Sequence, residues 1–144
     1  MKINIKHICI ITSSYPSVTN PVYTFLDNLV CAFADLGIQC TIISPNSISS
    51  NILGRTERKP VKWNKVTTNG NKIEIFSPNY ISFSNKKLLR YNTANLTLNC
   101  FKRVVQNEFI RLQKRPDVLY GHFLIPSGLT AAYLGEVYNI PSFF

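Results

Sequence analysis

The chain has 144 residues, and 45% of them are hydrophobic, which is enough for one domain with a real core and excludes an intrinsically disordered chain. Its 16 Lys and Arg against 7 Asp and Glu give a net charge of +9, which favours an anionic partner such as nucleotide phosphates, anionic lipid or nucleic acid. No run of about 18 apolar residues occurs, and the first residues lack a signal-peptide core, so we expect a cytoplasmic protein whose cysteines are reduced.

The first predicted unit is a strand, a helix and a second strand. Residues 8–11 form a short apolar run, which is typical of a strand buried on both faces. A polar loop at 12–19 follows, and Asn20 suits the N-cap of a helix that ends at Gly37. Residues 38–44 form the second strand. Such a unit is a right-handed parallel crossover, and the loop after its first strand is a usual place for a ligand.

A long polar loop is predicted from residue 46 to 64, followed by a β-hairpin. For the lone Trp63, which lies among lysines, core packing is the simpler interpretation, and an anchor at a membrane surface is the alternative. The arms of the hairpin are residues 65–68 and 71–76, and they flank Asn69-Gly70, where both residues tolerate positive φ. We expect the second arm to join the main sheet.

A helix with one apolar stripe is predicted from residue 91 to 114. After a strand at 118–120, the loop at 121–128 leads into a helix that ends near residue 138, with Ser127 as its cap. A further strand begins in the last four residues of the sequence. The predicted fold class is therefore α/β: a Rossmann-like, doubly wound, mainly parallel sheet with helices on both faces and a β-hairpin insertion.

Most catalytic signatures are missing from the sequence. It lacks G-x-G-x-x-G after the first strand, the P-loop motif and G-x-S-x-G, and it has no His, Cys or carboxylate pairs at ligand spacing, so we expect neither a metal nor a cofactor. His122 is the best candidate for a substrate contact, because it follows the third predicted parallel strand at its carboxyl end; a structural histidine also fits there. The hydroxyls of the first loop suit a polyol such as a sugar, although a plain polar turn explains them equally well.

Several motifs recur in a fixed order along almost the whole chain. The first group is Tyr15-Pro16, residues 20–26, Gly37 and residues 41–45. The second group is Pro78-Asn79-Tyr80, residues 116–123, Pro126, Gly128-Leu129, Ala131-Ala132 and Ile140-Pro141. In this order and spacing, the chain resembles the N-terminal domain of family 4 glycosyltransferases, which are retaining, nucleotide-sugar-dependent enzymes of the two-domain GT-B class.

The resemblance implies an acceptor-side domain that faces a C-terminal domain holding the nucleotide-sugar donor. The glutamate pair and the donor-phosphate Arg and Lys of the family belong to that second domain, so we expect no catalytic residue in residues 1–144 and no activity from them alone. Many members carry a glycine in the first loop, where this chain has Val22-Tyr23-Thr24. The candidate acceptor-binding residues are His122, Phe123, Ser127 and Tyr80. The candidate donor-side residues are Ser13, Ser14, Tyr15, Asn20, Tyr23 and Thr24.

The basic residues suggest two kinds of partner besides a nucleotide-sugar and a glycan or lipid-linked acceptor. A peripheral contact with anionic lipid at the inner membrane face is predicted for residues 55–65, Lys86, Lys87 and Arg90. The alternative to a transferase is a non-catalytic α/β module that binds nucleic acid or a protein, through residues such as Tyr91, Phe101, Lys102 and Arg103. Basic residues around the carboxyl edge of the sheet favour the transferase, and a basic stripe along a helix favours the alternative.

Overall fold

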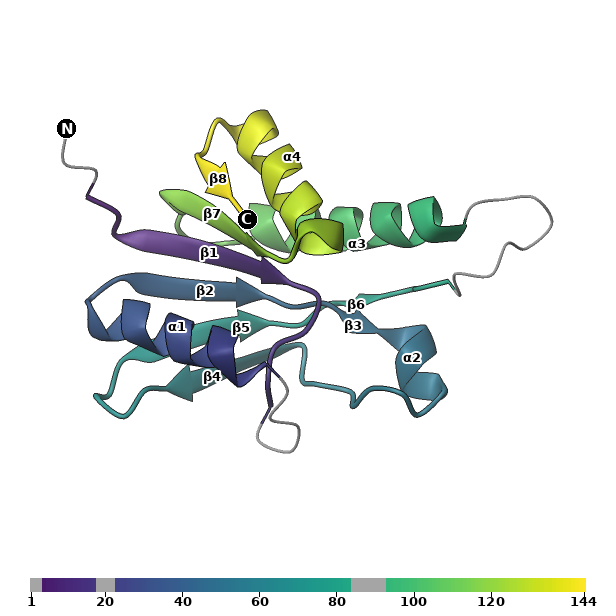
Figure 1. Cartoon of the computed structure of the whole chain (residues 1–144), viewed down its shortest axis with the longest axis horizontal. Helices are drawn as coiled ribbons and strands as arrows, with labels where there is room; N and C mark the ends of the chain where they lie inside the picture. Colours follow the sequence, from purple (N-terminus) through teal and green to yellow (C-terminus); the bar gives the residue numbers. More distant parts are fainter. Residues whose placement is uncertain (1–3, 18–22, 84–92) are drawn as a thin grey trace.

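The computed structural model describes residues 4–17, 23–83 and 93–144, which form a mixed α/β fold around a mostly parallel six-stranded sheet (Figure 1). The strand order is β4-β5-β2-β1-β7-β8, and β4 alone runs antiparallel to its neighbour. These strands are β1 (His7–Thr12), β2 (Gln39–Ile43), β4 (Lys62–Val66), β5 (Lys72–Phe76), β7 (Val118–His122) and β8 (Ser142–Phe143). A second, parallel pair consists of β3 (Asn46–Ser47) and β6 (Asn79–Tyr80).

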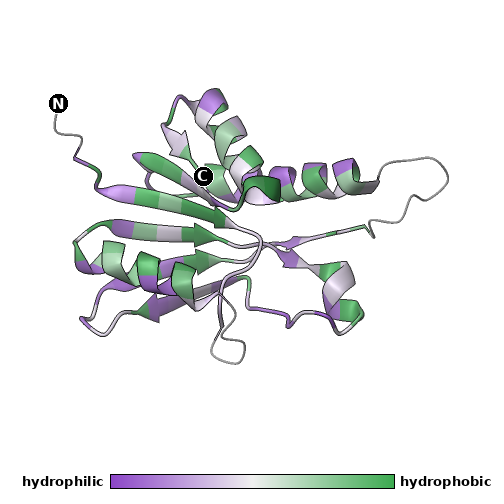
Figure 2. Ribbon diagram, in the orientation of Figure 1, coloured by the Kyte–Doolittle hydropathy of each residue, from purple (hydrophilic) through white to green (hydrophobic). Residues whose placement is uncertain are grey.

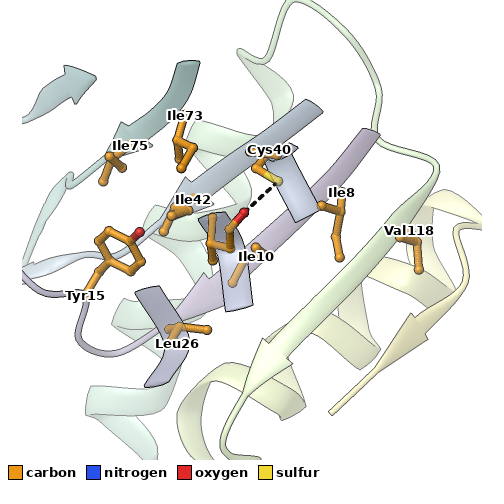
Figure 3. Packing of buried hydrophobic residues seen from close by; sticks show 11 residues of the cluster. Ile8, Ile10, Tyr15, Leu26, Cys40, Ile42, Ile73, Ile75 and Val118 are labelled. Atoms are coloured by element: carbon orange, nitrogen blue, oxygen red, sulfur yellow. Dashed lines mark hydrogen bonds between the residues drawn. The ribbon is translucent and has the colours of Figure 1, made fainter. Parts of the chain in front are cut away.

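Helices pack on both faces of the sheet. The helical segments are α1 (Thr24–Asp35), α2 (Ile48–Ile52), α3 (Thr93–Ile110), the short segment η1 (Leu124–Gly128) and α4 (Leu129–Tyr138). Because side chains alternate along a strand, Ile8 and Ile10 of β1 pack with α1 (Figure 3), whereas Cys9 and Ile11 pack with α3 and α4. Figure 2 shows hydrophobic residues concentrated in the central strands. Each fully buried aliphatic side chain stabilises the fold by about 1.5–3 kcal/mol.

The start of α1 differs from the prediction. The predicted cap, Asn20, lies outside the described residues, and Tyr23 occupies the N-cap position in a left-handed conformation, with φ 63°. The Tyr23 carbonyl accepts hydrogen bonds from the N–H groups of Leu26 (3.1 Å) and Asp27 (3.4 Å), and no side chain caps the helix. The helix therefore begins with backbone hydrogen bonds to Tyr23 alone, which the preferences of capping side chains do not predict. Gly37 ends the unit with φ 82°, as predicted.

The region predicted as a long loop contains regular structure at both ends. β3 and α2 occupy its beginning, and β4 starts at Lys62 rather than at Lys65. Trp63 packs against the α1-side core, with its ring 6.3 Å from that of Tyr15, so core packing is right and the membrane anchor is wrong for this residue. The turn before β5 is also wider than predicted: Gly70 donates to the Thr67 carbonyl (2.9 Å) and takes a positive φ of 85°.

A polar contact ties α1 to two other parts of the chain. The Tyr15 hydroxyl donates to a carboxylate oxygen of Asp27 (2.6 Å), and the ammonium of Lys65 forms an ion pair with the same carboxylate. The partly buried carboxylate of Asp27 thus connects three elements: the loop after β1, helix α1 and strand β4.

Two further predictions can be compared with the structure. All four cysteines are free thiols, and Cys9 and Cys40 are buried, in agreement with the prediction. Helix α3 ends at Ile110, short of the predicted residue 114.

In the part of the chain that the structure describes, no helix is both long and apolar enough to cross a membrane.

Candidate functional site

Two loops begin side by side at the carboxyl edge of the sheet. The last residues of β1 and β7, Thr12 and His122, are register partners, so the chain leaves both strands at neighbouring points. The rings of Tyr23 and Phe123, which follow these two strands, meet edge to face with centroids 5.7 Å apart. In a parallel sheet this edge is where ligands usually bind. The candidate site has two parts, a polar hollow and an aromatic group.

The polar hollow is a cavity of about 170 Å³. Its walls come from the loop after β1, from the segment 45–59 that includes β3 and α2, and from β6. Hydroxyl and amide side chains dominate the lining, together with one lysine and one glutamate. The lining residues are Ser13, Ser14, Tyr15, Pro45, Asn46, Ser47, Ser50, Asn51, Thr56, Glu57, Lys59 and Tyr80.

Asn46 holds the walls of the hollow together. Its buried amide donates to the carbonyls of Lys59 (2.8 Å) and Ser77 (3.0 Å), and its side-chain oxygen accepts from the Lys59 N–H (3.4 Å). The Lys59 ammonium contacts the Tyr15 carbonyl, and burial lowers the pKa of this lysine, against the opposing effect of Glu57. One cation is thus fixed in the wall of an otherwise mostly neutral cavity.

This composition suits a ligand with many hydroxyl groups. Serine, threonine and asparagine side chains offer both donors and acceptors, as a polyol does. With one cation and one carboxylate among its lining residues, the hollow has no excess charge with which to hold a multivalent anion. Since ligand pockets usually measure about 300–1,000 Å³, it has room for one small ring or one end of a larger ligand.

The aromatic group surrounds His122. The Tyr120 hydroxyl lies 3.1 Å from Nδ1 of His122 in a hydrogen bond, and the Phe123 ring lies 4.2 Å from the imidazole between centroids. On the other side, Tyr120 stacks on Phe143 at 4.9 Å. Together with Tyr23, these residues present several rings at one edge of the sheet, three of which, Tyr23, Phe123 and Phe143, are exposed.

Phe123 has a backbone conformation that residues other than glycine rarely adopt. Its φ of 69° and ψ of 152° lie in a region populated almost entirely by glycine, at a cost of about 1–3 kcal/mol. Its side chain is nevertheless 53% exposed, so core packing does not account for the strain. Backbone strain of this kind clusters at functional positions.

Two of the predicted site residues that the structure describes, Ser127 and Thr24, do not contribute a side chain to either part. Ser127 is fully buried, its hydroxyl has no hydrogen-bond partner within the described ranges, and Gly128 rather than Ser127 precedes α4, so the predicted cap is wrong. Its burial follows from the close approach of Gly121 to Gly128. Thr24 is exposed at the start of α1 and does not line the hollow, and Asn20 lies outside the described residues.

The other predicted residues fall into the two parts. Ser13, Ser14 and Tyr80 line the polar hollow, and Tyr80 also packs edge-on against Phe101, where burial raises its pKa. The ring of Tyr15 belongs to the core. Its backbone carbonyl, which contacts the Lys59 ammonium, lies in the wall of the hollow. His122, Phe123 and Tyr23 form the aromatic group, as described above.

Sequence reasoning missed most of the second wall of the hollow and two members of the aromatic group. One signal was present: the serines and asparagines after Pro45 follow the second parallel strand, whose carboxyl end lies at the same edge as that of the first. The missed residues are Asn46, Ser47, Ser50, Asn51, Thr56, Glu57, Lys59, Tyr120 and Phe143.

The imidazole of His122 gives the stability a predictable pH dependence. Burial lowers its pKa below the ordinary value of 6.5, so the unfolded chain binds this proton more readily than the folded chain. The free energy of unfolding should therefore fall as the pH is lowered from about 7.5 to about 5, through the unfolded-state pKa toward the lower folded-state pKa. Urea titrations across this range should show a smaller fall for His122→Asn, which keeps a polar partner for Tyr120.

His7 is the control for this prediction. Burial also lowers its pKa, so part of the pH dependence should remain in His122→Asn. His7→Gln, which keeps a polar partner for Thr41, should remove that other part. A pH profile that His122→Asn leaves unchanged would contradict the prediction.

Among the described residues, no group of three or more His, Cys, Asp or Glu side chains is arranged to hold a metal ion. No protein-family model matches the chain, and no curated protein sequence matches it. Its function must therefore be argued from its motifs and from the geometry of the candidate site.

Proposed function

We propose that this chain is the N-terminal, acceptor-side domain of a glycosyltransferase, which transfers a sugar from a nucleotide-sugar to a polysaccharide or lipid-linked acceptor in the cytoplasm. The observation that carries the proposal is the meeting of the β1 and β7 loops at the carboxyl edge of the sheet, where hydroxyl-rich and aromatic surfaces gather. The motif order shared with family 4 glycosyltransferases supports the same proposal.

The proposal extends to the finer description of the fold. We take the sheet to be Rossmann-like and doubly wound, with β4 and β5 as a hairpin inserted at one edge. The parallel order of β5, β2, β1 and β7 and the packing of helices on both faces support this description.

In this proposal, each part of the site contributes residues to both ligands. His122, Phe123 and Tyr80 contact the acceptor, whereas Ser13, Ser14 and Tyr23 face the donor. The absence of excess positive charge in the hollow supports a donor diphosphate held mainly by a second domain. Residues 1–144 alone are then expected to show no sugar transfer.

Binding of neutral disaccharides to the whole chain tests the acceptor role. We expect cellobiose or N,N′-diacetylchitobiose to shift the NMR signals of the Phe123 and Tyr80 amides and of the His122 ring. Phe123→Ala removes an aromatic contact and should weaken binding by about 5-fold to 10-fold. Phe25→Ala is the matched control, since Phe25 is 70% exposed on α1 outside the site.

A variant with glycine separates ligand binding from folding. Phe123→Gly relieves the backbone strain and is therefore expected to bind the disaccharide weakly without losing stability. Saturating disaccharide that leaves these signals unmoved, or an equal loss of affinity in Phe25→Ala, would refute the proposed acceptor site.

We also propose that α2 and the segment after it contact an anionic membrane. Ile52 is 79% exposed and Leu53 is 63% exposed, and the exposed Arg55 and Arg58 follow them directly. Apolar side chains beside cations suit the interface of a bilayer with negatively charged lipids. Three other basic residues of the predicted segment lie elsewhere: Lys59 contacts the Tyr15 carbonyl, Lys65 pairs with Asp27, and Lys62 lies beside the Phe76 ring. Lys86, Lys87 and Arg90, which were also predicted for this contact, lie outside the described residues.

Sedimentation with vesicles tests the membrane contact. The chain should bind vesicles that contain phosphatidylglycerol more tightly than vesicles of phosphatidylcholine alone, and salt should weaken this binding. Ile52→Ser with Leu53→Ser should reduce it, whereas Ile110→Ser, at an exposed position on α3, should not. Equal, salt-independent binding to both kinds of vesicle would overturn the proposal.

A further inference from the structure

A second hollow, with a different character, lies on the α3 side of the sheet. Beneath α3 and α4 this face is apolar, with Cys9 and Ile43 in the core. Farther along, at β2, β5 and β4, the same face carries Thr41, Glu74 and Lys62, which are polar or charged. A cavity of about 480 Å³ opens there, beside the C-terminal end of α3, and we call it the basic hollow. It shares no lining residue with the polar hollow.

The basic hollow has an excess of positive charge. Its lining includes the cations Lys62, Lys72, Arg111 and Lys114 and the single carboxylate of Glu74. Lys72 lies 3.7 Å from that carboxylate, and the Lys62 ammonium lies 4.8 Å from the centre of the Phe76 ring, which does not neutralise it. A guanidinium nitrogen of Arg111 lies 3.9 Å from a carboxylate oxygen of Glu108 on α3, and the Arg111 side chain is largely exposed. Even with these contacts, the hollow remains basic.

A buried histidine forms part of its lining. His7 is only 6% exposed, and its Nε2 lies 2.9 Å from the Thr41 hydroxyl. A hydrogen bond with the Arg115 backbone and the bond to Thr41 hold this ring in place, so its NMR signals can report on charge that enters the hollow. Charged groups that act on this ring come from several elements: Lys114 after α3, Asp117 before β7 and Glu74 on β5.

We propose that the basic hollow binds a small molecule that carries phosphate groups, at a site distinct from the candidate site at the carboxyl edge. Its volume lies within the usual range for ligand pockets, about 300–1,000 Å³. Arginine and lysine side chains are the common protein partners of phosphate oxygens, through charge-assisted hydrogen bonds. The inference uses none of the residues on which the proposed transferase function depends.

The chain has two histidines, one in each candidate site, and this makes a direct test possible. Titration of the whole chain with inorganic pyrophosphate, followed through the imidazole NMR signals, should shift the signals of His7 saturably and leave those of His122 in place. Arg111→Gln with Lys114→Gln should weaken this binding by about 10-fold or more. Arg55→Gln with Arg103→Gln removes the same charge from exposed positions outside the hollow and should change the affinity by less than about 2-fold.

Three results would overturn the inference. The first is a shift of both histidines at similar concentrations, or of His122 alone. The second is an equal loss of affinity in the two double variants, which would indicate general attraction to a basic chain. The third is tighter binding of single-stranded RNA that displaces pyrophosphate and depends on Lys102 and Arg103 of α3, which would favour the nucleic-acid alternative.

Discussion

Gly121→Ala is expected to lower the free energy of unfolding by about 3 kcal/mol. A Cβ at this position would lie 2.5 Å from Cα of Gly128 and 2.8 Å from the Ser127 carbonyl oxygen. Both are backbone atoms, and the Gly128 N–H is itself held by the Phe123 carbonyl at 2.8 Å. The segment cannot move away without disturbing the turn that carries Phe123, so the substitution should damage the candidate site as well as stability.

Urea denaturation followed by circular dichroism measures this effect. Gly54→Ala is the control, because a Cβ at Gly54 meets no atom within 4 Å and only the positive φ of 66° opposes it. We expect that variant to lose about 1 kcal/mol, clearly less than Gly121→Ala. A Gly121→Ala variant as stable as Gly54→Ala would show that η1 moves away from β7 at little cost.

Asp27→Ala is expected to lower the free energy of unfolding by about 2–3 kcal/mol. It leaves the buried hydroxyl of Tyr15 and the ammonium of Lys65 without their shared acceptor. Because Asp27 and Lys65 are only partly buried, we expect less than the full loss seen for ion pairs in protein interiors.

Asp27→Asn separates the charge from the hydrogen bond. Its amide oxygen still accepts from Tyr15, so we expect about half of the loss in urea denaturation. Glu136→Ala, an exposed carboxylate on α4, should change the free energy of unfolding by no more than about 0.5 kcal/mol. If Asp27→Ala proves as mild as Glu136→Ala, Asp27 does not hold the β1 loop, α1 and β4 together.

Much of the fold could be predicted because hydrophobic periodicity records burial directly. The continuous apolar run of β1 and the helical spacing in α1 and α3 were enough to predict these elements. The same reasoning failed at the beginning of β4, where polar residues at exposed positions make the strand resemble a loop. It also failed at Tyr23, where backbone carbonyls rather than a capping side chain start the helix.

The candidate site was predicted less completely, because its walls depend on contacts between distant segments. The place of His122 at the carboxyl end of a parallel strand followed from sequence, and its register with Thr12 confirms that place. Ser127 was wrongly placed at the surface, since nothing in the sequence reveals how closely Gly121 approaches Gly128. Asn46 and Lys59 were missed because an asparagine amide and a lysine thirteen residues away meet only in the folded chain.

The central claim concerns sugar transfer, and the most direct measurement is made on the full-length product of the gene that encodes this chain. We expect it to transfer radiolabelled sugar from one of UDP-glucose, UDP-galactose, UDP-N-acetylglucosamine or GDP-mannose to a glycan or lipid-linked acceptor in a membrane extract. Phe123→Ala and His122→Asn should each lower kcat/KM by about 10-fold, whereas Phe25→Ala should not. Transfer from none of these donors, or robust turnover by residues 1–144 alone, would contradict the account.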